Sequence, residues 1–369
     1  MTVELSPAQR EASSRILDWL TRSPERELYL AGYAGTGKTT IAAQLIAELE
    51  LRVCVATLTG KAASVLRRKG VYQAQTIHSM IYVPVPNTDP IEWSLDQVSP
   101  LAYADLLIVD EVSMVGHDLA DDLRSYGKKI LVLGDPGQLP PIHGTGAFTS
   151  REPDVFLSEI HRQAAESPII RLATMARQGQ PIPLSDEPVA RVVPLSFNEV
   201  LASRGQLICG THRARWAITK RVRERDGFGG TIPGAGERVI CRRNNREHGL
   251  YNGLIGTVAE VLDDGDNDEE GRPYLKIVMD DLQAPIETRV ELTPFLEHTD
   301  GLRRPYLRRR GVELFDFGYV LTCHSAQGSE WPDVTVVDDS SAFREDADRW
   351  LYTALTRASE RITLLKRIP

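Results

Sequence analysis

Short apolar runs alternate with segments of helical period over most of this chain. The runs are rich in Val, Ile and Leu, and the segments between them are long enough to form helices. Strands separated by helices at this spacing are typical of parallel sheets that are covered on both faces. The sequence therefore predicts an α/β protein. The predicted strands lie at 28–31, 52–57, 105–110, 130–134, 206–209, 334–337 and 362–365.

Two stretches depart from this alternation. Residues 83–100 contain four prolines around Trp93 and predict an irregular excursion or short hairpin. Between residues 236 and 310 the helical period disappears and only strand-like runs remain, which predicts a small β-barrel inserted in the second half of the chain. The runs in this second stretch lie at 238–241, 256–262, 274–279 and 288–292, with turns at 252–253 and within 263–271.

Composition and charge narrow the possible classes of protein. The chain has 369 residues and a formal charge of 43 − 51 = −8, so we expect at least two domains. No apolar run approaches the roughly 18 residues that a bilayer requires, and the four cysteines form no C-x-x-C pair. We therefore expect a cytoplasmic, bacterial or viral protein without membrane contact, zinc knuckle or disulfide framework. Its acidic balance confines any nucleic-acid binding to a local groove.

Residues 32–39, Gly-Tyr-Ala-Gly-Thr-Gly-Lys-Thr, match the pattern G-x-x-x-x-G-K-[ST] between a predicted strand and a predicted helix. In such a loop the backbone N–H groups bind phosphates, the lysine reaches the β and γ phosphates, and the threonine hydroxyl binds Mg²⁺. A glycine turn without a ligand is the alternative. The candidate ATP-binding residues here are Gly32, Gly35, Thr36, Gly37, Lys38, Thr39 and Thr40.

Two later strands end in polar residues. Asp110 and Glu111 follow an apolar run, and we expect Asp110 to hold Mg²⁺ while Glu111 orients and deprotonates an attacking water. A second carboxylate favours hydrolysis over transfer to an acceptor, although a solvated turn is the usual explanation of a bare Asp-Glu pair. Gln138, in the loop 134–141, is a candidate γ-phosphate sensor, with a proline-stiffened loop as the alternative.

Small polar residues that suit phosphate contacts recur along the chain. Each of them alone is as often an ordinary cap or turn residue. The candidate residues for such contacts, which the resemblance described next assigns to DNA binding, are Thr59, Lys61, Thr76, His78, Thr211, His212, His324 and Ser325.

Several stretches, taken in order, resemble the motifs of the superfamily 1 DNA helicases, and most closely those of the RecD/Dda-like type. They lie at 5–9, 57–63, 76–79, 110–114, 134–141, 160–163, 322–331 and 352–357, beside the phosphate-binding loop. The resemblance implies that Gln9 reads adenine, that Glu330 contacts the ribose, and that Arg162 and Arg357 contact the γ-phosphate. One departure is Ser325-Ala326, which is similar to the UvrD-like branch.

The resemblance also implies an architecture of two tandem RecA-like P-loop lobes. The first covers 1–150, with 83–100 as a short pin, and the second covers 151–235 and 311–369, with 236–310 as an SH3-like β insertion. Because both arginines fall on the second lobe, catalysis is expected to require lobe closure, so that hydrolysis drives a hinge.

The sequence thus predicts a helicase that uses ATP and Mg²⁺, translocates on single-stranded DNA and unwinds duplex, with 5′→3′ polarity. Expected partners are single-stranded DNA and single/double-strand junctions, a single-strand-binding or replication protein is a candidate partner, and the active form is expected to be a monomer. One alternative is a translocase that displaces proteins or anneals strands without processive unwinding. A small-molecule kinase is disfavoured by Glu111. The basic run 303–310 is either a solvated surface or a phosphate-gripping element, and the acidic run 263–270 would repel DNA.

Overall fold

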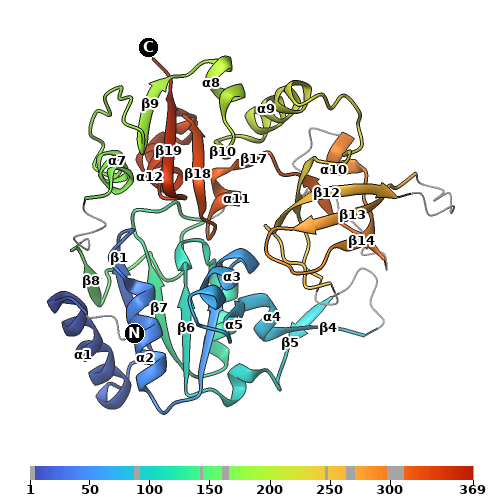
Figure 1. The fold of residues 1–369 in the computed structure, drawn as a ribbon. Coiled ribbons are helices and arrows are strands. Elements are labelled where there is room, and N and C mark those ends of the chain that lie inside the picture. Colours follow the sequence, from blue (N-terminus) through green and yellow to red (C-terminus); the bar gives the residue numbers. More distant parts are fainter. Residues whose placement is uncertain are drawn as a thin grey trace. The chain divides into compact units, whose positions relative to one another are not determined.

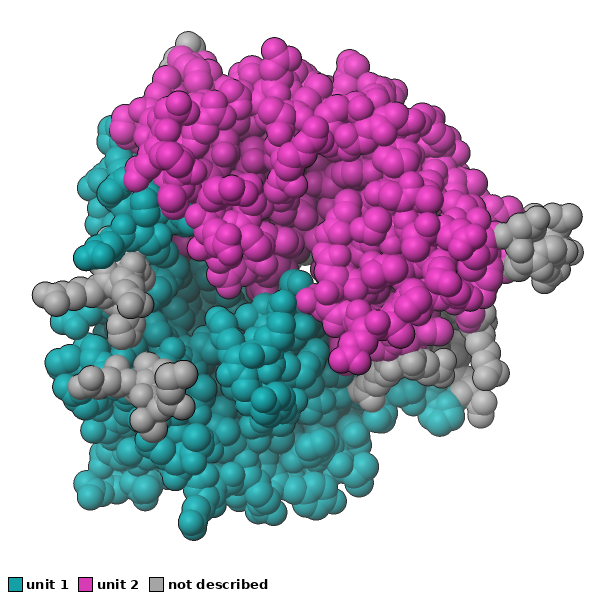
Figure 2. Space-filling model, in the orientation of Figure 1, with its two compact units in different colours: residues 1–181 teal, residues 182–369 magenta. Residues whose placement is uncertain are grey.

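The computed structural model describes residues 5–86, 92–141, 144–159, 166–245, 248–262, 271–296 and 311–368. The chain forms two compact units, residues 1–181 and 182–369 (Figure 2). In the described ranges no helix is both long and apolar enough to cross a membrane. Each unit is built around its own parallel sheet (Figure 1).

The first unit contains a six-stranded sheet in which all neighbouring strands are parallel. Its register pairs Leu30 with Leu133 and Leu107 with Ile130. Because parallel strands end at the same edge, the loops that follow them meet there. The spatial order is β3 (Gln75–Thr76), β2 (Val53–Thr57), β6 (Leu106–Asp110), β7 (Lys129–Gly134), β1 (Glu27–Gly32) and β8 (Val155–Leu157).

Alternate residues of these strands enter two separate cores. Leu28 and Leu30 of β1 pack with residues of the first two helices, whereas Tyr29 and Ala31 face the other core. This double burial explains why the strands read as continuous apolar runs. The helical elements are α1 (Pro7–Arg22), α2 (Lys38–Glu48), α3 (Gly60–Arg68), α4 (Ile77–Ile81), η1 (Pro100–Tyr103), η2 (Val112–Met114), α5 (His117–Ser125) and α7 (Pro168–Arg177).

The proline-rich excursion begins as a two-stranded antiparallel ribbon. It consists of β4 (Tyr82–Pro84) and β5 (Trp93–Leu95), and Pro84 pairs with Trp93. The Trp93 side chain is exposed. A short hairpin was one of the two expectations from the sequence, and the described part of the excursion has that form.

The second unit contains a five-stranded sheet that is also wholly parallel. The strands predicted at 206–209, 334–337 and 362–365 all form within it. Its order is β17 (Val320–Thr322), β10 (Gln206–Cys209), β18 (Trp331–Val337), β19 (Ala358–Lys366) and β9 (Ala190–Pro194). The accompanying helices are α8 (Phe197–Ala202), α9 (His212–Arg225), α11 (Cys323–Ala326), η3 (Ser340–Asp346) and α12 (Ala347–Leu355).

A second sheet in this unit has a core of its own. Its neighbouring strands are antiparallel, except that β14 and β15 are parallel. The order is β15 (Val312–Glu313), β14 (Ile286–Val290), β13 (Tyr274–Met279), β12 (Ile255–Leu262), β11 (Arg238–Cys241) and β16 (Phe315–Phe317), accompanied by α10 (Thr293–Leu296).

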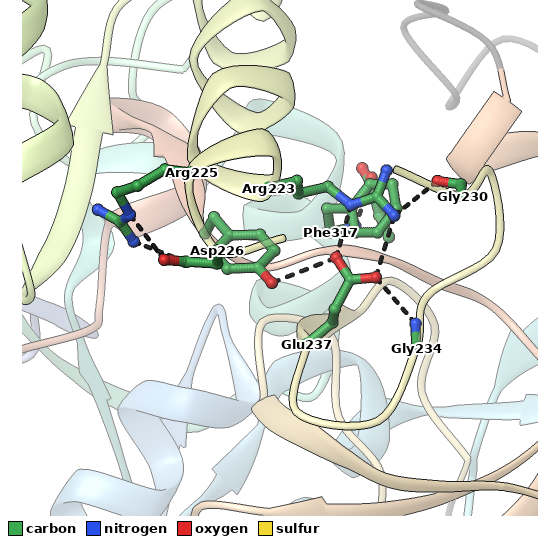
Figure 3. A network of polar contacts seen from close by, with 9 residues as sticks. Arg223, Arg225, Asp226, Gly230, Gly234, Glu237 and Phe317 are labelled. Atoms are coloured by element: carbon green, nitrogen blue, oxygen red, sulfur yellow. Dashed lines mark hydrogen bonds and ion pairs between the residues drawn. The ribbon is translucent and has the colours of Figure 1, made fainter. Parts of the chain in front are cut away.

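Helix α9 joins the two sheets of the second unit. Its Ile218 and Val222 belong to the core of the parallel sheet, whereas Trp216 packs against the core of the β insertion. Arg223 binds the buried carboxylate of Glu237, with Nε 2.5 Å from Oε1 and Nη2 3.0 Å from Oε2 (Figure 3). A fully hydrogen-bonded buried pair of this kind holds its partners in one geometry, because separating them would leave a charge uncompensated.

The Glu237 carboxylate has further partners around this pair. The Gly234 N–H donates to Oε2 at 2.8 Å and the Tyr319 hydroxyl donates to Oε1 at 3.2 Å, while the Arg223 guanidinium lies 4.0 Å from the centre of the Phe317 ring (Figure 3). The β insertion is thereby fixed to α9.

Two ends observed in the structure differ from the predicted limits. The first compact unit ends at Pro181, whereas the predicted first lobe ends at residue 150, and β8, which follows that limit, pairs with β1. The sheet of the β insertion extends to Phe317, beyond the predicted limit at residue 310, because β15 and β16 join it. Strand β14 begins and ends two residues before the predicted run 288–292. The runs 263–270 and 303–310 lie outside the described residues.

Candidate functional site

The glycine-rich loop connects β1 to α2, as the motif requires. Gly35 and Gly37 have φ angles of 79° and 81°, a left-handed conformation that favours glycine. A side-chain carbon on Gly32 would lie 2.6 Å from Oγ1 of Thr36. The Thr36 hydroxyl donates to the carbonyl oxygen of Tyr33 at 2.8 Å. The loop is therefore closed by its own contacts, with no room for a side chain at Gly32 and a left-handed backbone at Gly35 and Gly37.

Lys38 lies at the start of α2 and its ammonium is held by backbone carbonyls. Nζ donates to the carbonyl oxygen of Gly32 at 2.6 Å and to that of Tyr33 at 3.1 Å. Both acceptors are neutral, so these contacts orient the ammonium without cancelling its charge. Thr40, the next candidate after Thr39, is half-buried on α2.

Asp110 and Thr39 come together from β6 and α2. The Thr39 hydroxyl donates to Oδ2 of Asp110 at 3.2 Å, and the Glu111 N–H donates to Oδ1 at 2.9 Å. Glu111 has a φ of 56°, so the chain turns directly after β6, as expected for two acids that share a site. Burial, and secondarily the charge of Glu111, raise the pKa of Asp110 to about 6, against the opposing effect of Lys38.

A hydroxyl and a carboxylate are oxygen donors of the kind that Mg²⁺ binds, and this ion commonly takes its other ligands from water and substrate phosphates. In the described part of the chain no group of three or more His, Cys, Asp or Glu side chains could hold a metal ion. The pair Thr39 and Asp110 thus fits an ion that is held by few protein atoms.

Gln9 contacts the loop from α1, whereas Gln138 follows β7, the strand beside β1. The Gln9 amide donates to the carbonyl oxygen of Thr36 at 3.1 Å, and its Oε1 accepts from the Ser6 N–H at 3.0 Å. Gln9 therefore braces the loop against the start of α1. Gln138 is buried, and its Oε1 accepts no hydrogen bond from the described residues.

Arg357 and Glu330 belong to the second unit. The Arg357 guanidinium is buried and donates to the carbonyl oxygens of Thr353 at 3.0 Å and Ser329 at 3.3 Å. Glu330 is exposed just before β18. Arg162 lies outside the described residues.

The candidate DNA-binding residues of the first unit follow two adjacent strands. Thr59 accepts from the Ala62 N–H at 3.2 Å at the start of α3, and Thr76 accepts from the Ser79 N–H at 3.1 Å at the start of α4. Strands β2 and β3 are neighbours. His78 is exposed, whereas Lys61 is buried. The structure thus brings Thr59 and Thr76 to the same edge of the sheet.

The second unit repeats this arrangement. Thr211 accepts from the Ala214 N–H at 3.2 Å at the start of α9, and Thr322 accepts from the Ser325 N–H at 3.3 Å at the start of α11. Strands β10 and β17 are neighbours. Burial, and secondarily the nearby His212, lower the pKa of His324, while Asp346 opposes them.

A short sequence repeat marks these two turns, and the resemblance to helicase motifs did not reveal it. Residues 76–79 read Thr-Ile-His-Ser and residues 322–325 read Thr-Cys-His-Ser. In both stretches the threonine hydroxyl accepts from the N–H of the serine three residues later. Thr322, which was not among the candidates, is therefore the counterpart of Thr76.

The parallel sheets, the phosphate-binding loop and the paired carboxylates define a P-loop nucleotide-binding fold. An AAA domain model matches residues 4–187, and a UvrD-like helicase C-terminal domain model matches residues 317–365. The chain thus contains an AAA domain followed by a UvrD-like helicase C-terminal domain, and it is similar to a superfamily 1 helicase of the RecD type.

Individual relatives agree with these two domain matches. The ATP-dependent RecD2 DNA helicase of Deinococcus radiodurans is 30% identical, over 95% of this chain and 48% of the relative. The conjugal transfer protein TraA of Rhizobium radiobacter is 25% identical, over 92% of this chain and 31% of the relative. This chain therefore spans about half and about a third of their respective lengths.

Solved structures show a similar fold. The crystal structure of Bacteroides Pif1 bound to single-stranded DNA matches with a TM-score of 0.63 and 20% identity, over 100% of this chain and 93% of that one. The predicted mixed α/β architecture with parallel sheets is thereby confirmed.

Proposed function

We propose that this chain is an ATP- and Mg²⁺-dependent DNA helicase that translocates on single-stranded DNA and unwinds duplex in the 5′→3′ direction. The observation that carries the proposal is the contact of Thr39 with Asp110 beside the phosphate-binding loop, combined with threonine-capped turns in both units. One relative is an ATP-dependent DNA helicase, and a structurally similar Pif1 was crystallised on single-stranded DNA. The polarity rests on the resemblance to RecD/Dda-like motifs.

The chemistry follows from the residues beside the loop. Backbone N–H groups of residues 32–37 and the Lys38 ammonium bind the phosphates, and a carboxylate oxygen of Glu111 accepts a proton from the attacking water. Thr39 and Asp110 would hold Mg²⁺, which supplies positive charge to the phosphate oxygens. Gln138 is a polar contact for the γ-phosphate, and Gln9 and Glu330 are candidates for the base and the ribose.

Arg162 and Arg357 are the proposed cationic contacts to the γ-phosphoryl group. An arginine in this role contributes about 10³–10⁵ in rate. The Arg357 guanidinium donates to the uncharged oxygens of Ser329, Thr353 and Thr356. Because Lys38 belongs to the first unit and Arg357 to the second, each turnover would couple nucleotide chemistry to motion of the units.

The proposed DNA contacts are the threonine-capped turns of the two units, with Thr59, Thr76 and His78 in the first and Thr211, His212, His324 and Ser325 in the second. Hydroxyl and imidazole groups hold the phosphate backbone without reading sequence. This mainly neutral contact set agrees with the net charge of −8, because a motor must release its strand at every step.

The remaining elements are assigned by resemblance. The ribbon of β4 and β5, with the exposed Trp93, is the proposed strand-separating pin. The six-stranded sheet that begins at β11 is the proposed SH3-like insertion. The proposed partners are single-stranded DNA and fork junctions, the proposed active form is a monomer, and a single-strand-binding or replication protein remains a candidate partner.

ATP turnover with and without single-stranded DNA tests the proposal. We expect stimulation of at least about tenfold, because arginine placement in such motors depends on the bound strand. Glu111→Gln is the control, since it keeps the shape of the side chain and removes the proton acceptor. Turnover that is equal with and without DNA would contradict the helicase assignment.

Replacement of residues 83–100 by a short linker distinguishes unwinding from translocation alone. Displacement of a DNA-bound protein along a single strand should persist, while separation of a duplex should fall. Equal unwinding by the replaced variant would contradict the pin assignment. A wild-type protein that displaces proteins and never separates duplex would favour the alternative of a translocase.

A further inference from the structure

The loop that follows β18, residues 338–346 including the short helical element η3, contacts both threonine-capped turns of the second unit. Asp339 is buried, and its Oδ2 accepts from the Gly210 N–H at 3.1 Å, directly before Thr211. Its Oδ1 accepts from Nη2 of Arg367 at 2.6 Å. A side-chain carbon on Gly210 would lie 2.5 Å from Cβ of Asp339, so the two backbones are in close contact.

Phe343 of the same loop lies between the turns. Its ring centre is 5.8 Å from that of His324, and a side-chain carbon on Gly210 would lie 2.9 Å from its Cε2 atom. On its other side the ring stacks on Trp350, with centres 5.5 Å apart and planes 19° apart. Trp350 is fully buried on α12, so Phe343 rests on a fixed support.

The backbone next to Phe343 is strained. Arg344 has a φ of 50° and a ψ of −112°, a conformation that side chains other than glycine rarely adopt. Such strain persists where the surrounding contacts hold the chain in place, and it concentrates at functional sites. Here the contacts of Asp339 and Phe343 with the turns hold the segment that leads directly into the strained residue.

We propose that Phe343 and Asp339 are positioning residues for nucleic-acid binding, which hold the turn at Thr211–His212 and the turn at His324–Ser325 in one fixed geometry. The proposal rests on the proposed function, because it assumes that both turns bind the DNA backbone. Two turns act jointly on one DNA strand when their relative positions are already fixed before the strand binds. Neither residue contacts the strand in this account. Phe343 acts through His324 and Gly210, and Asp339 acts through Gly210.

Packing alone is the competing explanation, since Phe343 also supports α12, which leads to Arg357. The two explanations predict different changes in DNA-stimulated ATP turnover. A packing defect lowers the rate at saturating DNA. A positioning defect raises the DNA concentration that gives half-maximal stimulation.

The test compares Phe343→Ala with Phe343→Tyr, using an oligothymidine strand as the DNA. For Phe343→Ala we expect the half-maximal DNA concentration to rise about tenfold, since small misplacements of contacting groups have effects of this order or larger. The rate at saturating DNA should fall by less than about threefold. Phe343→Tyr keeps the ring and should restore a half-maximal concentration close to that of the wild type. Phe197→Ala is the matched control, because Phe197 is an exposed phenylalanine of the same unit.

Gly210→Ala tests the same contact from the opposite side and covers the case in which Phe343→Ala does not fold. We expect the same rise in half-maximal DNA concentration, because the added methyl group would displace Phe343 and Asp339. The imidazole NMR signals of His324 should shift in both variants. An unchanged half-maximal concentration in both folded variants, or a lowered maximal rate alone, would overturn the proposal. A wild-type protein that binds no single-stranded DNA would instead overturn the proposed function itself.

Discussion

The two Thr-x-His-Ser turns share a sequence, a position on the sheet and a capping hydrogen bond, yet different surroundings support their histidines. His78 is exposed, with its ring 5.6 Å from that of Tyr82, whose hydroxyl donates to Asp122. His324 is half-buried against Phe343, which stacks on the buried Trp350.

The serines differ as well. The Ser79 hydroxyl donates to the carbonyl oxygen of Thr76 at 2.9 Å, so it is turned back on its own backbone. The Ser325 hydroxyl accepts from the Thr322 hydroxyl at 2.9 Å and can donate its own proton to another group. The capping geometry is thus a property of the local sequence, whereas the environment of each turn depends on residues far away in the chain.

The difference suggests unequal roles on DNA. A side chain that is held in one orientation loses less freedom on binding than an exposed one does. The turn of the second unit is therefore expected to hold the strand more tightly than the turn of the first unit. The variants below test this inequality, beginning with the change of largest expected effect.

Lys38→Ala tests whether the threonine-capped turns still bind single-stranded DNA when ATP hydrolysis is lost. We expect ATP hydrolysis to fall by at least about 10³-fold, because the charge that the loop directs at the phosphates is lost. Binding of single-stranded DNA should remain measurable by fluorescence anisotropy, since no turn contains Lys38. Lys69→Ala, at the exposed end of α3, is the control. Loss of DNA binding in a folded Lys38→Ala protein would contradict the separation of the two sites.

His324→Ala compared with His78→Ala tests the inequality directly. We expect His324→Ala to weaken single-strand binding about tenfold and His78→Ala about threefold, because Phe343, the aromatic neighbour of His324, is itself stacked on the buried Trp350. Dissociation constants at one fixed salt concentration measure both effects. Equal losses, or a larger loss in His78→Ala, would show that aromatic support does not determine the contribution of a turn.

Asp110→Asn tests the electrostatics of the nucleotide site. The pKa of Asp110 is raised to about 6, so the folded protein binds this proton more tightly than the unfolded chain, and stability falls as the pH rises from about 4 to 6. Without nucleotide and Mg²⁺, the variant should melt several degrees above the wild type at pH 7.5. The difference should shrink at pH 5, where the wild-type carboxyl is itself protonated. A difference that does not vary with pH would contradict the raised pKa.

Tyr82→Phe tests how Tyr82 supports His78 in the turn of the first unit, which is expected to hold DNA less tightly. This variant has the smallest expected effect. The variant removes the hydrogen bond to Asp122 and keeps the ring beside His78. Single-strand binding should change by less than about twofold, as is usual where one partly exposed hydrogen bond is lost. A tenfold loss would mean that the polar contact of Tyr82, rather than its ring, positions His78.

Local signals made much of this structure predictable. The phosphate-binding loop, the carboxylates after β6 and the helix after the loop each depend on neighbouring residues, and the structure has them as expected. Strands β3, β8, β9 and β17 were not predicted. They are only two to five residues long and lie at or next to the edges of their sheets, so they carry little hydrophobic pattern.

Contacts between residues far apart in the chain could not be predicted from the sequence, for a different reason. The bond from Gln9 to Thr36 and the packing of Phe343 between Gly210 and His324 join segments that no periodicity relates. The pairing of β8 with β1 is a further contact of this kind. The recurrence of Thr-x-His-Ser was present in the sequence. Its structural role is seen only in the fold, where Thr76 and Thr322 each end an edge strand and cap the helix that follows.

Strand displacement on partial duplexes with opposite single-stranded tails tests the central claim most directly. With ATP and Mg²⁺, the account predicts separation of a duplex that carries a 5′ tail, little separation with a 3′ tail, and none for Lys38→Ala. Unwinding from the 3′ tail alone would contradict the polarity. The absence of unwinding from either tail, in a protein that hydrolyses ATP on single-stranded DNA, would contradict the helicase assignment.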